Sequence, residues 1–287
     1  MIRRAAGFFF LLLAITASAR AQTPAPPAQT PIEPDRPDVT NGTHIIDTGL
    51  LQVEFGGLYT RVSADQRSWG SPFTARVGLA EWLEARIGAD GLASQADSGS
   101  RATGFGNVQI GAKLRLRADP GGIPVLSILP TVNLPTASVD KGLGSGDADY
   151  TVALLTGTDF LTRGHIDINY GIGAIGAGGG RPHFVQHLVS ASASVAATDA
   201  WNPYAEVFWF SRQDPNAGAM TAMDVGAIYT VNPRLALDGG MQIGLSQAAP
   251  GVAAFAGISV VVGDVLGGHG VHARQRTAEK RARAPHR

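Results

Sequence analysis

A run of strict alternation at residues 104–117 (GFGNVQIGAKLRLR) constrains the fold of this chain more than any other feature. From Asn107 onward every second residue is apolar, and the residues between them include Lys113, Arg115 and Arg117. Successive side chains of a β-strand point to opposite faces, so the run predicts a strand with one apolar and one charged face. Three cations are too costly to bury unpaired in a dry core. The charged face must therefore meet bulk water or line a wet interior.

Composition favours the wet interior. The 287-residue chain has 37 glycines, no cysteine and 16% charged residues. An ordinary soluble domain has about 25% charged residues. After the N-terminal region no stretch is apolar for the roughly 20 residues that a membrane-spanning helix needs. Low charge, abundant glycine and alternation without such a helix together predict a transmembrane β-barrel.

The chain divides into four predicted parts. Residues 1–21 have the charged start, apolar run and Ala-Arg-Ala site of a secretory signal peptide, which predicts export and cleavage after Ala21. Residues 22–48 are proline-rich and lack a period, which predicts an extended, mobile periplasmic lead-in. Residues 49–262 carry the alternation and are the predicted barrel. Residues 263–287 are a basic tail that we expect to be disordered, and either an inert extension or a contact to peptidoglycan or acidic head groups.

Twelve segments of the predicted barrel alternate in this way, and an even count returns both chain ends to one side of the membrane. Short links follow every second segment and longer links follow the others, which predicts short periplasmic turns and long external loops. We therefore predict an all-β, antiparallel up-and-down barrel of about 12 strands that is monomeric. The predicted strands begin at Gly49 and continue at residues 72–79, 83–91, 104–117, 123–133, 150–160, 165–175, 184–196, 203–211, 220–230, 235–245 and 251–262.

Aromatic residues on the apolar phase are expected to face lipid or the interfacial girdles of such a barrel. In a soluble protein each would instead be an ordinary half-buried sheet residue. The predicted outward aromatics are Phe55, Tyr59, Phe73, Tyr170, Trp209 and Tyr229.

Charged residues on the polar phase are predicted to line the lumen. Most are interpreted as salt bridges that hold the wall together, and the alternative is a charged constriction that selects solutes. Charges within residues 84–90 should pair with the cations within residues 113–117 across neighbouring strands. The longest loop, 134–149, is glycine-rich and is the predicted plug or constriction. The predicted lumen residues are Glu54, Arg76, Glu84, Arg86, Asp90, Lys113, Arg115, Arg117, Asp167, Glu206 and Asp238.

Several segments also carry a resemblance to a known family. They are DRPD at residues 35–38, GLLQVEFG at 49–56, the run at 104–117, LPTAS at 134–138 and GVAAFAGISVVV at 251–262. In their order and spacing the chain resembles the outer-membrane transporters of the phenol meta-degradation pathway, over about residues 34–262. The resemblance implies an outer-membrane channel, and only the label of the family suggests aromatic solutes.

Two departures from the family pattern bear on this resemblance. Asn107 stands where the family usually has Asp. In the family pattern the closing strand ends the chain on an aromatic residue that the barrel-assembly machinery reads, whereas here Val262 ends the predicted strand and residues 263–287 follow.

The predicted function is passive uptake or efflux of small, apolar or aromatic molecules through a channel in the bacterial outer membrane. The expected partners are membrane lipid, the solute and the barrel-assembly machinery, with no nucleic acid, cofactor or metal. A non-conducting structural or adhesion barrel, closed by its own ion pairs, is the alternative.

A third hypothesis, an outer-membrane hydrolase, is disfavoured because the sequence lacks G-x-S-x-G and H-E-x-x-H motifs. His183 and His187 lie about 13 Å apart if they share a strand, too far to hold one metal ion. The sequence therefore predicts no enzyme.

Overall fold

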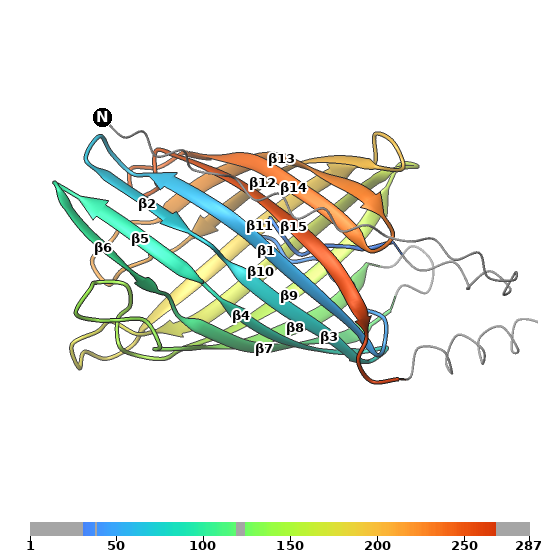
Figure 1. Ribbon diagram of the computed structural model, residues 1–287, viewed down its shortest axis with the longest axis horizontal. Coiled ribbons are helices and arrows are strands. Elements are labelled where there is room, and N and C mark those ends of the chain that lie inside the picture. The colour runs from blue at the N-terminus through green and yellow to red at the C-terminus, as the bar shows by residue number, and fades with distance from the viewer. Residues whose placement is uncertain (1–30, 38, 119–123, 268–287) are drawn as a thin grey trace, which may run out of the picture.

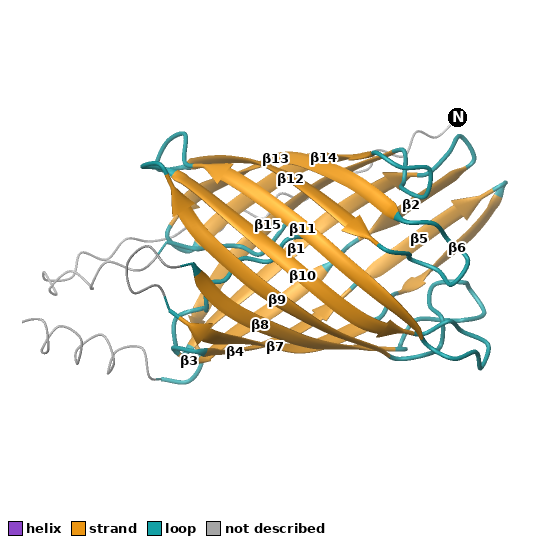
Figure 2. Cartoon of the chain, turned by 180° about the vertical axis from the view of Figure 1, so that it is seen from behind, coloured by secondary structure: helices purple, strands orange, loops and turns teal. Residues whose placement is uncertain are grey.

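The computed structural model describes residues 31–37, 39–118 and 124–267, and these form a β-barrel (Figures 1 and 2). No helix in these residues is long and apolar enough to cross a membrane. The predicted signal peptide, the start of the lead-in, the turn at 119–122 and most of the basic tail lie outside the described residues.

Twelve antiparallel strands form a closed wall, because β15 pairs with β1 over the length of both strands. Each of the twelve also pairs with the next along the chain, so the order is up-and-down, as predicted. The wall consists of β1 (Leu50–Arg61), β3 (Phe73–Ala80), β4 (Leu83–Ala89), β7 (Val108–Arg117), β8 (Val125–Leu134), β9 (Asp149–Phe160), β10 (Gly164–Ile175), β11 (Phe184–Val195), β12 (Trp201–Phe210), β13 (Met220–Asn232), β14 (Leu235–Gly244) and β15 (Val252–Asp264).

Three further strands extend one side of the wall beyond the barrel. β2 (Gln66–Gly70) pairs with the end of β1, then with β5 (Leu92–Asp97), which pairs with β6 (Ser100–Phe105). They project past the other strands at the end of the barrel that carries the long links, here called the loop end (Figure 1). The opposite end, with the short links, is the turn end.

The sequence pattern predicts long loops at residues 63–71 and 92–103, between the predicted strands. The three extra strands lie mainly in these two stretches, so the prediction of loops there was wrong. The three strands continue β3, β4 and β7 beyond breaks at residues 71–72, 90–91 and 106–107. Many of their residues are exposed on both faces. A strand that extends past the lipid-facing region has no need for one apolar face, so its sequence lacks the membrane alternation.

The two faces of the wall are reversed relative to a soluble domain. Apolar side chains such as Ile110, Leu116 and Ile168 are exposed on the outside, whereas Lys113 is completely buried on the inside. The predicted outward aromatics follow this pattern, with Phe73 half-buried and the other five exposed. The alternation of residues 104–117 thus describes an apolar exterior and a polar interior.

The lead-in departs from expectation. Its described part, residues 31–37 and 39–48, lies inside the barrel, as the loop within the ring of strands in Figure 2, and is held by hydrogen bonds to lumen side chains. Ile32 packs there with Ala236 and Val261, and Val39 packs against a cluster around Phe208. The described part of the lead-in is thus bound to the lumen wall over much of its length.

The loop at 134–149 does not take the position expected of a plug. Its described bonds go to the rim at the loop end, where Thr136 accepts from the Val108 amide at 3.0 Å and Lys141 donates to the Thr103 carbonyl at 2.8 Å. The lead-in occupies the lumen instead. There, its backbone and side-chain donors bond to buried lumen carboxylates. The lead-in has no sequence period, so periodicity could not predict these contacts.

Candidate functional site: a lead-in bound across the lumen

The first side of the site is a basic wall, defined as Arg76 on β3, Arg86 on β4 and Lys113 on β7. These strands are neighbours, and all three side chains sit on the inward phase of their alternation. All three converge on the Asp35 carboxylate of the lead-in. Its Oδ2 lies 2.7 Å from Lys113 Nζ and 3.3 Å from Arg76 Nη2, and it also pairs with Arg86. One lead-in carboxylate thus compensates three buried cations, two of them completely buried.

Two wall carboxylates complete this network. Arg76 donates to Glu54 at 2.8 Å and to Glu84 at 2.9 Å, and both acids are almost completely buried. The same carboxylates bind the lead-in backbone: Glu54 accepts from the Arg36 amide at 3.0 Å and Glu84 from the Ile46 amide at 3.1 Å. Charge-assisted bonds of this kind are shorter and stronger than neutral ones. Removing the lead-in would therefore leave several buried charged groups with fewer partners.

The opposite side of the site is an acidic wall, defined as Glu206 on β12, Asp224 on β13 and Asp238 on β14. Arg36 of the lead-in forms an ion pair with Asp238 at 3.3 Å. Glu206 and Asp224 face each other in the register of β12 and β13, and both are buried. Asp35 and Arg36 are adjacent in sequence yet bind opposite walls. Together they form a crossbar, with its negative end on the basic wall and its positive end on the acidic wall.

Hydrogen bonds to charged and neutral lumen side chains fix the rest of the lead-in. Glu206 accepts from the amides of Val39 at 3.0 Å and Thr40 at 2.5 Å, and also from the Thr40 hydroxyl. Further along, the Asn41 amide donates to Asn169 at 2.7 Å, and the carbonyl of Gly42 accepts from Lys113 at 2.7 Å. The buried lumen groups are thus paired with a backbone that has no regular structure of its own.

Glycines in the wall make room for this segment. A side chain at Gly78 would place its Cβ 2.2 Å from the Ile46 carbonyl oxygen, and one at Gly56 would meet the Arg36 guanidinium at 2.1 Å. Real Cβ atoms essentially never come so close. Gly78 is therefore needed for the lead-in backbone to lie where it does, whereas a Cβ at Gly56 would require the flexible Arg36 side chain to shift. The glycine content that suggested a barrel therefore also serves the bound lead-in.

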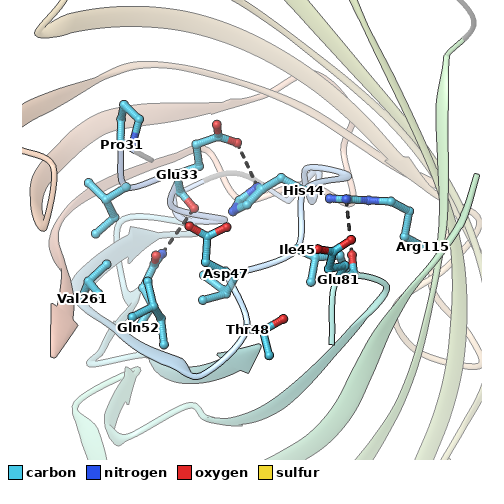
Figure 3. Close-up of a pocket in the computed structure, with 13 residues that line it drawn as sticks. Pro31, Glu33, His44, Ile45, Asp47, Thr48, Gln52, Glu81, Arg115 and Val261 are labelled. Carbon is cyan, nitrogen blue, oxygen red and sulfur yellow. Dashed lines mark hydrogen bonds and ion pairs between the residues drawn. The ribbon is translucent and has the colours of Figure 1, made fainter. Parts of the chain in front are cut away.

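The lead-in separates two cavities. The loop-end chamber, about 460 Å³, lies between Asp35 and Arg36 and inward residues such as Gln109, Thr151 and Phe210. The turn-end pocket, about 270 Å³, is lined by other residues of the lead-in and by Arg115 and Val261 (Figure 3). No lining residue is shared by the two cavities. The lead-in is thus the barrier between the two halves of the lumen.

His44 is the titratable side chain that Figure 3 places at the centre of the turn-end pocket. Its Nδ1 lies 3.2 Å from a Glu33 carboxylate oxygen. Burial, together with the nearby cations Arg76 and Lys113, holds the pKa of His44 well below its usual value. The imidazole is therefore neutral at neutral pH.

The predicted lumen residues fall into two groups. Those that contact the lead-in or lie beside it are Glu54, Arg76, Glu84, Arg86, Lys113, Asp167, Glu206 and Asp238, with Asp167 placed beside Thr43 and bonded to His165 at 3.2 Å. The other three bind elsewhere. Asp90 accepts from the Asn107 amide at the loop end, and Arg115 and Arg117 donate to the carbonyls of Glu81 and Pro124 near the turn end.

The charged residues of β4 and β7 are neighbours across the two strands, as expected, but the Lys113 ammonium bonds to the lead-in. Glu84 and Lys113 are direct partners across the two strands, but the Lys113 ammonium donates to the lead-in at Asp35 and Gly42. The residues that sequence reasoning missed are those of the lead-in itself, above all Asp35, Arg36 and Thr40. The signal that could have found them is a DR pair placed just before a barrel whose lumen carries both charges.

Comparisons with known proteins agree with this architecture. A model of the family described as "Putative MetA-pathway of phenol degradation" matches residues 34–261. No curated protein matches the chain. An outer membrane channel from Pseudomonas putida F1 is 13% identical with a TM-score of 0.63, covering 80% of this chain and 99% of its own. The NanC porin is 10% identical with a TM-score of 0.54, covering 74% and 100%. At such identities the likeness establishes the fold.

Proposed function

The chain belongs to the family of the MetA pathway of phenol degradation, and on this premise we propose that it is an outer-membrane channel for the passive movement of small molecules. The names of two similar structures, an outer membrane channel and a porin, support the proposal. Small, apolar or aromatic solutes are the proposed cargo, and the label of the family is the only ground for the aromatic class.

The observation that carries this proposal is a polar lumen with a cavity on each side of a single internal barrier. The loop-end chamber and the turn-end pocket are separated by the lead-in, not by strands of the wall. A volume of about 460 Å³ falls in the usual range for small-molecule sites. Movement of one non-periodic segment would therefore join the two cavities into a path along the barrel.

The test is conductance of the purified chain in planar bilayers, followed by swelling of proteoliposomes in a panel of solutes. The proposal expects channel events and faster swelling for small solutes than for large ones. Protein denatured before reconstitution serves as the control. Folded protein that gives neither channel events nor solute-dependent swelling, with the lead-in in place or released, would contradict the proposal.

A second candidate function is a non-conducting structural or adhesion barrel. The observation in its favour is the crossbar itself, because Asp35 and Arg36 are anchored to both walls of the lumen. The two functions predict different results when the lead-in is released from the wall. A barrel that stays closed after the Asp35 anchor is removed would be structural, whereas a barrel that opens would be a channel.

We propose that the chain is not an enzyme, and that it is exported, inserted by the barrel-assembly machinery and surrounded by outer-membrane lipid. The exposed apolar exterior supports the lipid contact. For the tail, contact with peptidoglycan or acidic head groups remains a hypothesis. Co-sedimentation of the full chain and of a chain ending at residue 267 with peptidoglycan would test it.

A further inference from the structure

We propose that the loop-end chamber is a binding site for a neutral ring molecule that carries a hydroxyl group. This inference rests on the proposed channel function and assigns the chemistry of the solute that the channel holds. The chamber lining combines apolar side chains, neutral hydrogen-bonding groups and balanced charges.

Part of the chamber lining is apolar. Leu129 on β8, Leu188 on β11 and Phe210 on β12 line it, and all three lie on the inward phase of their strands. Phe210 also contacts Phe208 edge-on, with ring centroids 6.1 Å apart, in the cluster that Leu188 joins. An aromatic ring and two leucines on one cavity lining suit the flat face of a ring molecule.

The lining of the chamber also carries neutral hydrogen-bonding groups. Thr74 on β3, Gln109 on β7 and Thr131 on β8 line it. Within the described part of the chain these three side chains form no hydrogen bond with one another or with any other group. A ligand hydroxyl can both donate to and accept from such groups, whereas a hydrocarbon cannot.

The floor of the chamber is formed by charges that already balance. Asp35 and Glu54 stand against Arg36 and Arg86, two of each sign. A charged ligand would find no net opposite charge there and would lose its hydration, so burial favours a neutral molecule. One acceptor remains open at this floor: Asp35 Oδ1 is buried and has no hydrogen-bond partner among the described residues.

Glycines, which have no side chain, give the chamber its width. Gly88 on β4, Gly111 on β7 and Gly171 and Gly173 on β10 occupy inward positions along its lining. A Cβ at Gly88 would lie 3.4 Å or more from its neighbours, so alanine fits there without displacing the wall. Such a variant would narrow the chamber while preserving the fold.

The experiment measures binding by isothermal titration calorimetry, with the full chain in lipid nanodiscs and empty nanodiscs as the background. Benzyl alcohol, toluene and benzoate serve as probes, because they share a ring and differ in hydroxyl group and charge. Glucose is the fourth probe. The proposal expects saturable binding of benzyl alcohol or glucose. For the aromatic probes it expects toluene to bind about 3- to 10-fold more weakly than benzyl alcohol, because toluene lacks one hydrogen bond. It expects benzoate to bind more weakly because its charge must lose hydration without gaining a net opposite charge.

Two variants and a matched control locate the site. Thr131→Val should weaken binding of the hydroxylated probe by about 3-fold or more without affecting toluene. Gly88→Ala should weaken the larger bound probe through loss of space. Thr156→Val, at an outward position of β9, should change neither.

Each outcome of the titrations either supports or overturns the proposed site. Binding of benzyl alcohol points to an aromatic source and binding of glucose to a sugar, and either supports the site. Equal binding of toluene and benzyl alcohol, tighter binding of benzoate, or no effect of Thr131→Val would overturn it. Channel events with no binding of any probe would overturn this inference and leave the proposed channel intact.

Discussion

The basic and acidic walls of the lumen hold the same lead-in in different ways. On the basic wall the Asp35 carboxylate is shared by Arg76, Arg86 and Lys113, and bonds to Glu54 and Glu84 surround it. On the acidic wall one ion pair and several amide donors hold the lead-in. Asp224 Oδ1 and Asp238 Oδ2 have no hydrogen-bond partner among the described residues. The basic wall is therefore the anchor of the lead-in, and the acidic wall is the weaker contact.

Loss of the Asp35 carboxylate should have the largest effect on stability and conductance. Asp35→Ala would leave three buried cations with a shared partner missing, and breaking a buried ion pair typically costs about 3–5 kcal/mol. We expect lower stability in urea-induced unfolding and a larger conductance, because the lead-in loses its anchor. Asp199→Ala, which removes a fully exposed carboxylate, is the control. Unchanged conductance together with unchanged stability would show that Asp35 is not the anchor.

Loss of the Arg36 guanidinium should have a smaller effect. Arg36→Ala removes a single ion pair at 3.3 Å, and a hydrogen bond to a charged group contributes about 1.5–3 kcal/mol. The basic wall would still hold Asp35, so conductance should rise less than in Asp35→Ala. Unfolding of both variants measures the difference. A larger loss for Arg36→Ala would reverse the assignment of the two walls.

Substituting one glycine on each side of the lumen should give the smallest difference in stability between the two walls. Gly78→Ala on the basic side would push its Cβ into the Ile46 and Asp47 backbone, where overpacking costs about 1–3 kcal/mol. Gly257→Ala meets the flexible end of the Arg36 side chain at 2.7 Å and should cost about 1 kcal/mol less, because that side chain can shift. Gly70→Ala, with open space around it, is the control for both. Equal losses for Gly78→Ala and Gly257→Ala would show that the lead-in backbone yields as easily as a side chain.

The wall was predictable because its alternation is enforced by two solvents. Lipid outside and water inside require an apolar and a polar phase, so the predicted barrel strands agree with the structure to within two residues at most ends. The run at 104–117 shows where this fails. Its first residues belong to β6, which extends beyond the apolar region and is separated from β7 by a break.

The lead-in could not be placed for a related physical reason. Periodicity assigns a face to Lys113 or Glu206, but it cannot name a partner that arrives from a segment without a period. Asp35 and Arg36 stand in a proline-rich stretch whose hydrogen bonds go to side chains far along the chain, from the Arg36 amide to Glu54 and from the Arg36 guanidinium to Asp238. The charges in the lumen were therefore visible in the sequence, while the group that neutralises them was not.

The lead-in lies in the lumen and closes it until the segment moves. The hydroxyl oxygens of Thr40 and Ser190 are 2.9 Å apart, and the chain has no natural cysteine, so Thr40→Cys with Ser190→Cys should form one disulfide. The measurement is single-channel conductance of this double variant before and after reduction. The account predicts that the disulfide forms, that the oxidised barrel stays closed, and that reduction restores the conductance of the unmodified chain. Failure of the two cysteines to join, or equal conductance in both states, would contradict it.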